Sequence, residues 1–436
     1  MTETIINECP NNWNDVNISA LGEIVSGGTP SRGNRWFWNG DIRWVTPTVI
    51  TALKDKWLSD TPEHITEAGL RFSSAKLLPP QSIVVTTRAT LGARAITKVA
   101  LSTNQGFKSI IPNAETEPLW CYYIVETLQR EMERRAVGTT FAEISKSDFA
   151  TIPLCRPPKP EQARIAEILD IVDSAVRETE MVLAKVHQIK IALLHDLLLY
   201  GLNEHGQMRD PISRSEQFQN SPLGIIPKSW SARIIGDLAN HVRSGVTPTG
   251  GGRVYTRDGV VFLRSQNVAF EGLSLKDVAF IGDKTHAAMA RSEIFPFDVL
   301  LNITGASIGR CCYVPAGFRK ANVNQHVCAI RLVNPCREDA ALLAAILGSS
   351  IGQSQIEKLN IGSNRQGLNY PQIRSIVVPW PEPEERKEIV VRLEKMTARI
   401  EAEDTELSKL KQLKAGLSHD LLTGEVRVPI TTSVPA

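Results

Sequence analysis

Two stretches of the chain decide its fold. Residues 161–199 read EQARIAEILDIVDSAVRETEMVLAKVHQIKIALLHDLLL, and residues 384–422 read EERKEIVVRLEKMTARIEAEDTELSKLKQLKAGLSHDLL. Neither stretch contains proline, and Gly416 is the one glycine in the two stretches. Apolar residues recur at helical spacing. The pattern predicts two long helices that stop before Gly201 and Gly424. A helix of this length with one apolar stripe needs a partner, as in a coiled coil.

The apolar stripes of the two helices share one phase. Each position of the first stripe has its equivalent 224 residues later, which is a whole number of heptads. The pattern predicts coiled-coil seam residues at Ile165, Leu169, Val172, Val176, Leu183, Val186 and Leu193, and at Ile389, Leu393, Met396, Ile400, Leu407, Leu410 and Leu417.

Two lysines interrupt these stripes at equivalent positions, Lys190 and Lys414. In an antiparallel pair, each lysine would meet the start of the opposite helix, near Glu388 or Glu167. A charge in the seam weakens packing, so we expect the lysines to set the register of the pair. The alternative is that each side chain simply extends to solvent.

The segments that precede the helices also repeat. PNNW at 10–13 recurs as PKSW at 227–230, SGGTP at 26–30 recurs as SGVTP at 244–248, and Asn-Gln recurs at 104–105 and 324–325. Both segments mix short β-rich runs with a few helices, which is typical of α+β domains. We therefore predict two similar α+β domains and two long helices, with boundaries at 1–156 (first domain), 157–202 (first helix), 203–380 (linker and second domain), 381–425 (second helix) and 426–436 (tail).

Composition places the chain among globular proteins. It has 436 residues, 42% of them hydrophobic, and a net charge of +2. No apolar run reaches the roughly 18 residues that span a bilayer, and residues 1–10 lack the order of a signal peptide, so we expect a cytoplasmic protein. The seven cysteines lack C-x-x-C spacing, which favours free thiols over disulfides or zinc.

The sequence contains no convincing catalytic motif. It lacks the phosphate-binding G-x-x-x-x-G-K-[ST] pattern and any zinc-ligand spacing. The pairs His195-Asp196 and His419-Asp420 recur in step, but both fall in the last turn of a predicted helix, where histidine favours the negative end of the dipole. We interpret them as structural and expect a chain without enzymatic activity, metal site or cofactor of its own.

A domain followed by a long helix, repeated once, with SPLGIIPKSW at 221–230 and LLTGEVRV at 421–428, resembles the specificity subunit of type I restriction-modification systems. NQGFK at 104–108 and GTTFAEIS at 138–145 are similar to that family's target-recognition domains. The resemblance covers essentially the whole chain. It implies that each domain reads half of a bipartite DNA site and that the helices form an antiparallel coiled coil.

The resemblance also implies partners: double-stranded DNA, two adenine-methyltransferase subunits and ATP-driven restriction subunits. S-adenosylmethionine, ATP and Mg²⁺ would then belong to the partner subunits. The alternative is a duplicated coiled-coil scaffold that binds only proteins. Salt-dependent, sequence-selective DNA binding distinguishes the two interpretations, because a scaffold shows neither.

The distribution of charge and of polar residue types indicates candidate DNA-contacting residues. Residues 200–380 carry a net +6, whereas residues 1–156 are neutral and each helical segment carries −2. Side chains that contact phosphates and base edges gather in glycine-containing loops. Our candidates are Arg32, Arg35, Thr87, Arg88, Thr90, Lys108, Thr139 and Thr140 in the first domain, and Arg253, Arg264, Gln266, Asn302, Thr304, Ser307, Arg310, Asn364, Arg365 and Gln366 in the second.

Several of these features have a structural alternative. Gly27-Gly28 and Gly245 make turns or let the backbone approach phosphate, and we favour turns. Arg88 contacts DNA or forms a surface salt bridge. The Asn-Gln pair is identical in two domains that should read different half-sites, so we favour a structural role for it. By the same logic Asn364-Arg365-Gln366 suits specificity. For Trp36-Phe37-Trp38 we favour packing under a loop over insertion into a groove.

Overall fold

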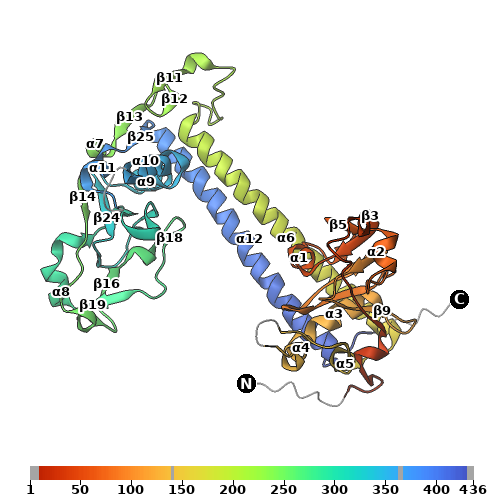
Figure 1. Cartoon of the computed structure of the whole chain (residues 1–436). Helices are drawn as coiled ribbons and strands as arrows, with labels where there is room; N and C mark the ends of the chain where they lie inside the picture. The colour runs from red at the N-terminus through yellow and green to blue at the C-terminus, as the bar shows by residue number, and fades with distance from the viewer. Residues whose placement is uncertain (1–8, 139–141, 362–366, 430–436) are drawn as a thin grey trace. The chain divides into compact units, whose positions relative to one another are not determined.

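The computed structural model describes residues 9–138, 142–361 and 367–429 (Figure 1). It divides into two compact units: unit 1 is Met1–Glu180 with Thr405–Ala436, and unit 2 is Met181–Asp404. Each unit holds one globular domain and about half of each long helix.

The two long helices form where the apolar periodicity predicts them. They are α6 (Lys159–Leu199) and α12 (Pro383–Thr423). The stops are glycines in the left-handed region, Gly201 at φ +62° and Gly424 at φ +77°, which a residue with a Cβ rarely adopts. Within the described residues, no helix is long and apolar enough to cross a membrane.

The helices run antiparallel. In unit 1, Asp173 of α6 pairs with Lys414 of α12, and Glu180 of α6 lies 2.7 Å from Lys411 Nζ. A later residue of α6 thus pairs with an earlier residue of α12, which is the antiparallel order. The predicted seam residues are all buried or half-buried. Ile165, Leu169, Val172, Val176, Val186, Ile389, Leu393 and Ile400 are buried, and Leu183, Leu193, Met396, Leu407, Leu410 and Leu417 are half-buried.

The partner of Lys414 differs from the prediction. Lys414 contacts Asp173, whereas Glu167 lies one and a half turns earlier on α6 and pairs with Arg164 at 2.6 Å. Glu388 likewise pairs with Arg392 of its own helix at 3.0 Å. Lys414 therefore lies opposite a later position on α6, Asp173, than the position near Glu167 that the sequence predicted.

The first globular domain is built on small sheets. A five-stranded sheet has the order β2-β9-β6-β7-β4, a three-stranded sheet the order β5-β3-β8, and β1 pairs with β10. The strands are β1 (Asn14–Asn17), β2 (Gly22–Ser26), β3 (Trp38–Val45), β4 (Trp57–Leu58), β5 (Glu63–Ile65), β6 (Ile83–Arg88), β7 (Thr90–Thr97), β8 (Leu101–Thr103), β9 (Lys108–Pro112) and β10 (Pro153–Arg156). The helices are α1 (Pro47–Ala52), α2 (Glu67–Arg71), α3 (Pro118–Thr127), α4 (Gln129–Arg135) and α5 (Lys146–Ala150).

The second domain follows the same plan. Its sheets have the orders β14-β24-β21-β22 and β15-β19-β16-β23-β20, with pairs β11-β12, β13-β25 and β17-β18. The strands are β11 (Phe218–Ser221), β12 (Gly224–Pro227), β13 (Ser231–Ile234), β14 (Ala239–Ser244), β15 (Tyr255–Thr256), β16 (Val260–Leu263), β17 (Val268–Ala269), β18 (Gly272–Leu273), β19 (Ala279–Ile281), β20 (Glu293–Ile294), β21 (Val299–Asn302), β22 (Cys311–Tyr313), β23 (Ala321–Val323), β24 (Val327–Leu332) and β25 (Val377–Trp380). The helices are α7 (Ile235–Leu238), α8 (Asp283–Ala288), α9 (Arg337–Gly348), α10 (Ser350–Ile361) and α11 (Tyr370–Ser375).

Strand order shows that the repeat is structural. The order β2-β9-β6-β7 of the first domain matches β14-β24-β21-β22 of the second. The parallel pair β3-β8 matches the parallel pair β16-β23, and β1-β10 matches β13-β25. Each domain is therefore α+β, as predicted, and the duplication extends to its hydrogen-bonded framework.

The long helices share the hydrophobic cores of the domains. In unit 1, Ile165 and Leu169 of α6 and Leu421 of α12 are buried with Trp120 and Phe149 of the domain. In unit 2 the corresponding core joins Leu197 and Leu198 of α6 to Ile389 and Leu393 of α12. Apolar burial of this kind holds each domain firmly on its helix ends.

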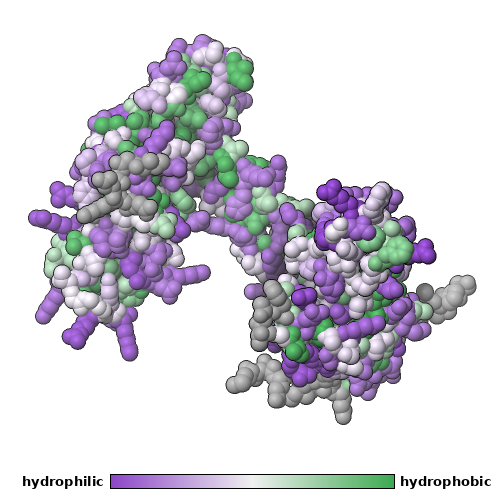
Figure 2. Space-filling view, in the orientation of Figure 1, coloured by the Kyte–Doolittle hydropathy of each residue, from purple (hydrophilic) through white to green (hydrophobic). Residues whose placement is uncertain are grey.

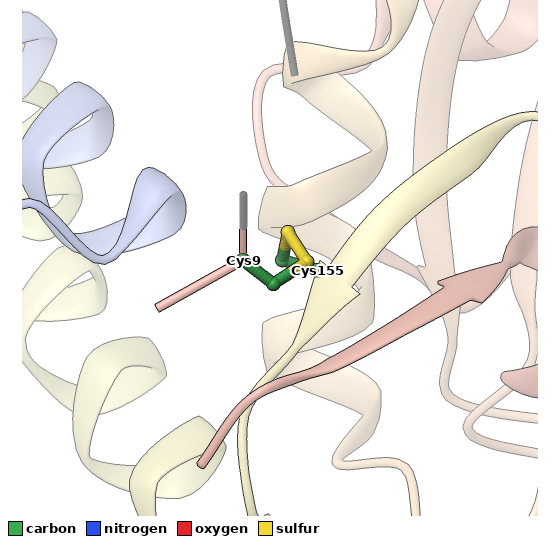
Figure 3. The surroundings of a disulfide bond; sticks show 2 residues. All are labelled: Cys9 and Cys155. Atoms are coloured by element: carbon green, nitrogen blue, oxygen red, sulfur yellow. A yellow bond between two sulfur atoms is a disulfide. The ribbon is translucent and has the colours of Figure 1, made fainter. Parts of the chain in front are cut away.

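The prediction of free cysteines is wrong for one pair. Cys9 and Cys155 form a disulfide, with Cα atoms 5.6 Å apart (Figure 3). Strand β1 pairs antiparallel with β10, with Asp15 opposite Cys155, and the chain before β1 turns back at Pro10. This pairing brings together two cysteines 146 residues apart, which spacing rules for cysteines do not detect.

Candidate nucleic-acid interface

The repeated Asn-Gln pair forms the same turn in both domains. Asn104 Oδ1 accepts a hydrogen bond from the Gly106 N–H at 2.9 Å, and Asn324 Oδ1 accepts one from the His326 N–H at 3.1 Å. The asparagine thus holds the turn, which agrees with the structural role expected for it. The two glutamines differ from the asparagines in burial. Both Gln105 and Gln325 are exposed to solvent.

Gly27 and Gly245 lie against these turns. A Cβ on Gly27 would stand 1.9 Å from the carbonyl oxygen of Asn104, and one on Gly245 would stand 1.6 Å from that of Val323. The Gly27 N–H donates to the Phe107 carbonyl at 3.3 Å and the Gly245 N–H to that of Asn324 at 3.1 Å. The requirement for glycine is therefore close packing of two backbone segments, neither the turn that we favoured nor an approach to phosphate.

Replacing Gly27 or Gly245 by alanine should destabilise its own domain by about 3 kcal/mol, because a backbone segment must move to relieve the overlap. Chemical denaturation of the full chain measures the change. Gly252→Ala is the matched control, since a Cβ there has no atom within 4 Å. Equal stability of Gly245→Ala and Gly252→Ala would contradict the close packing.

A second backbone segment completes the arrangement. The Thr87 N–H donates to the Gly106 carbonyl at 2.8 Å, and the Ile144 N–H donates to the Thr87 carbonyl at 3.0 Å. In the second domain the Ile303 N–H donates to the His326 carbonyl at 3.0 Å, and the Leu368 N–H to that of Ile303 at 2.9 Å. We call each arrangement the Asn-Gln cradle: residues 27, 87–88, 104–106 and 143–144 in the first domain, and 245, 303–304, 324–326 and 367–368 in the second.

Backbone pairing in the cradles makes two residues equivalent that the sequence repeat had not matched. Arg88 bridges to Glu143 as Thr304 bridges to Gly367, so Arg88 and Thr304 occupy equivalent positions. Arg88 lies next to the turn, because a Cβ added to Gly106 would stand 3.9 Å from Arg88 Cβ. The framework is thus conserved between the domains while the displayed side chains change.

The first cradle displays charge. Arg88 Nε lies 3.6 Å from Glu143 Oε2, and Lys108 Nζ lies 3.8 Å from Glu143 Oε1. Burial lowers the pKa of Lys108, and the Glu143 carboxylate opposes that effect. Both the exposed Arg88 and the buried Lys108 thus lie near the Glu143 carboxylate, and Arg88 is the cation that the first cradle presents to solvent.

The second cradle displays neutral hydrogen-bonding groups. Thr304 Oγ1 is hydrogen-bonded to His326 Nδ1, and Gln325 Nε2 lies 3.0 Å from His326 Nε2. With the Gln325 amide donating to Nε2, the imidazole carries its proton on Nδ1 and donates it to Thr304. Sequence reasoning singled out neither Glu143 nor His326. Glu143 reaches the cradle through its long-range pairing with Arg88, whereas His326 directly follows the repeated Asn-Gln pair and could have been selected from that position.

Other candidates in the first domain gather around β3 and β5. Arg32 pairs with both carboxylate oxygens of Glu63 and stacks 4.0 Å above the Trp38 ring. The hydrogen bond from Arg32 lowers the pKa of Glu63. In the aromatic cluster, Trp38 packs edge-on against Trp44, as favoured, but Trp36 is 84% exposed. Arg35 and Thr90 are also exposed.

In the second domain the exposed candidates are Arg253, Gln266 and Arg310, while Thr304 and Ser307 are half-buried. Arg264 donates to the Asp277 carbonyl at 2.8 Å, so it supports a loop. Hydrophilic side chains project from the surface over α8 and β19 (Figure 2), where Lys284, Arg291 and Lys320 are exposed. The net positive charge of this domain is therefore on its surface.

Some candidates lie inside the protein. Thr87 donates to the Gly106 carbonyl at 3.2 Å, and Asn302 to the Ser265 carbonyl at 2.8 Å; both are fully buried. Lys108 is 6% exposed. Thr139, Thr140, Asn364, Arg365 and Gln366 lie outside the described residues.

The repeated His-Asp pairs lie in the last turns of α6 and α12, as expected. His419, Asp420 and Glu425 have ligand atoms within 4.8 Å of one another, and His419 Nε2 lies 3.4 Å from Glu425 Oε1. Two of the three residues are exposed, and exposed groups of this kind are common without a metal ion.

The chain repeats one α+β domain, and the two copies present different side chains on the same framework. It therefore belongs to the class of proteins with two related binding domains connected by long helices. The family model for the type I restriction modification DNA specificity domain matches residues 10–188 and again residues 227–412. The chain belongs to this family, with one match in each repeat.

Individual relatives agree. The type I restriction enzyme MjaIX specificity subunit of Methanocaldococcus jannaschii is 29% identical over 56% of this chain and 55% of its own length. The S subunit of a type I restriction-modification system from M. genitalium matches with a TM-score of 0.56 and 14% identity over 96% of this chain and 98% of its own. A chain solved in work on complex assembly and conformational transition of the type I R-M system matches with a TM-score of 0.58 and 15% identity over 96% and 100%. These structures share the fold.

Proposed function

We propose that this chain is the non-catalytic specificity subunit of a type I restriction-modification complex. Each domain reads one half of a bipartite, asymmetric DNA site. The observation that carries the proposal is the pair of Asn-Gln cradles, which keep one framework and display different polar groups, Arg88 with Glu143 in one and Thr304 with His326 in the other. Two unlike readers on one scaffold are what an asymmetric two-part site requires.

The proposed DNA-contacting surface includes these exposed or half-buried candidates: Arg35, Arg88 and Thr90 in the first domain, and Arg253, Gln266, Thr304, Ser307 and Arg310 in the second. Residues 139–140 and 364–366 adjoin the cradles in sequence, and we include them. Thr87 and Asn302 are left out, because their side chains already bond to the protein's own backbone. The proposed target-recognition domains are 1–156 and 203–380, with spacer helices over 157–202 and 381–425.

The proposed partners follow from family membership. Two adenine-methyltransferase subunits and, for cleavage, ATP-driven restriction subunits would bind S-adenosylmethionine, ATP and Mg²⁺, and the complex would act on DNA in the cytoplasm. A chain that assembles with such subunits does not need to grip DNA alone. That division of labour agrees with a net charge of only +2.

The test is to map N6-methyladenine across the genome in cells that contain this chain and its methyltransferase partner, with and without the chain. We expect one bipartite motif with unlike halves and a constant gap. Adding one heptad to both α6 and α12 should change the gap and leave both halves unchanged, because the helices space the domains. Methylation that ignores the chain, or binding to DNA without sequence selectivity, would instead favour a protein-binding scaffold.

A further inference from the structure

The exposed glutamine of the Asn-Gln pair does not hold the turn in either domain. The asparagine side chain holds the turn in both cradles. Gln105 and Gln325 extend from the same turns into solvent. An exposed side chain that the fold does not need is free to differ between the two domains, as the neighbouring position does when Arg88 replaces Thr304. The glutamine nevertheless occurs in both.

The two domains orient this glutamine by different means. In the second domain, Gln325 Nε2 lies 3.0 Å from His326 Nε2, and His326 is in turn hydrogen-bonded to Thr304. The first domain has Gly106 at the position of His326, which offers no side chain. There the Thr29 hydroxyl donates to Gln105 Oε1. Both amides are therefore held by a hydrogen bond, although Thr29 holds the oxygen of Gln105 and His326 holds the nitrogen of Gln325.

Each oriented amide keeps an acceptor and a donor available. Gln105 Oε1 uses one lone pair on Thr29, and both of its N–H groups remain available. Gln325 uses one N–H on His326 and retains the other N–H and its oxygen. An amide that donates and accepts side by side complements the N7 acceptor and N6 donor of adenine in the major groove.

We propose that Gln105 and Gln325 each read an adenine, one in each half-site, through a bidentate contact of the amide. The inference rests on the proposed function and adds a base identity to it. Arg88 and Thr304, which lie beside the two glutamines, then contact positions at which the half-sites differ. A contact to phosphate alone needs only a donor, and it would not require the amide to be oriented.

The test uses the full chain, co-expressed and purified with its methyltransferase subunits, and binding to a randomised duplex library followed by sequencing. Gln325→Ala should reduce the preference for adenine at one position of one half-site by about 5- to 150-fold and leave the other half-site unchanged. Gln105→Ala should do the same in the other half-site. His326→Ala should produce a smaller loss at the position read by Gln325, because the amide loses its orientation but not its chemistry.

Gln412→Ala, on the exposed face of α12, is the matched control and should change no base preference. Thermal unfolding of each variant checks that the domains stay folded. Uniform weakening across all library sequences would identify phosphate contacts and overturn the inference, as would an unchanged adenine preference in both alanine variants. In both cases the wild-type complex would still select a bipartite motif. A wild-type complex without any sequence selection would overturn the proposed function itself.

Discussion

Replacing Glu385 by alanine should lower the free energy of unfolding of unit 2 by about 3–5 kcal/mol. The Glu385 carboxylate is 12% exposed at the start of α12. It accepts hydrogen bonds from the Leu202 N–H at 2.7 Å, from Trp230 Nε1 at 2.9 Å and from both terminal nitrogens of Arg209. Alanine would leave the Leu202 N–H and Trp230 Nε1 without this acceptor and the Arg209 charge uncompensated, which is the costly way to break a buried ion pair.

Urea unfolding of the full chain, followed by tryptophan fluorescence, measures this change, because Trp230 is one of the partners. Glu388→Ala is the control on the next turn of the same helix. Glu388 is exposed, and its pair with Arg392 at 3.0 Å spans one helical turn, so its loss should cost less than about 0.5 kcal/mol. If both variants lose the same stability, the carboxylate of Glu385 does not hold the segment after α6 against the second domain.

Unit 1 contains the equivalent cluster. Glu161, at the start of α6, accepts from Trp13 Nε1 at 3.1 Å and from Arg427 Nε at 2.7 Å. The tail after α12 thus contacts the first domain as the segment after α6 contacts the second. The repeated tryptophan was visible in the sequence. The arginines were not, because Arg427 lies 266 residues from Glu161, whereas Arg209 belongs to a segment that looked like a plain linker.

The features that the sequence predicted well are those encoded locally. Heptad spacing located α6 and α12, because a helix repeats its environment every few residues. The role of Asn104 in its turn was also predictable, since that bond spans two residues. Features that depend on chain topology were missed: the Cys9–Cys155 disulfide, the contact of Lys414 with Asp173, and the placement of Glu143 in the first cradle. Burial separated the candidates further, as residue type alone cannot tell a buried Thr87 from an exposed Thr90.

Asp173 is the centre of a polar cluster that joins the first domain to both helices in unit 1. It accepts a hydrogen bond from Lys414 of α12, and its Oδ2 lies 3.5 Å from Lys56 Nζ and 3.8 Å from Arg177 Nη1. The Lys56 side chain is 1% exposed and also lies 2.6 Å from Asp170 Oδ1. This cluster is the physical basis for the expectation that Lys414 sets the helix register, with Asp173 as the partner.

Asp173→Asn should reduce the stability of unit 1 by about 3 kcal/mol at neutral pH, because it leaves the buried Lys56 and the partly exposed Lys414 and Arg177 with less compensating charge. Burial pushes the pKa of Asp173 up, but the hydrogen bond from Lys414 and the charges of Lys414, Lys56 and Arg177 outweigh it, so the pKa is lowered. A carboxyl with a lowered pKa stabilises the folded state above its unfolded pKa of about 4 and loses that contribution as the pH falls through its folded value.

The difference in stability between wild type and Asp173→Asn should therefore be constant near neutral pH and shrink below about pH 4. Urea unfolding at a series of pH values measures it. Glu178→Gln removes an exposed carboxylate from the same helix, so it should leave the pH profile close to that of the wild type. A difference that stayed constant down to acidic pH would show that the variant acts through packing, and Lys414 would then lose its proposed role in setting the register through charge.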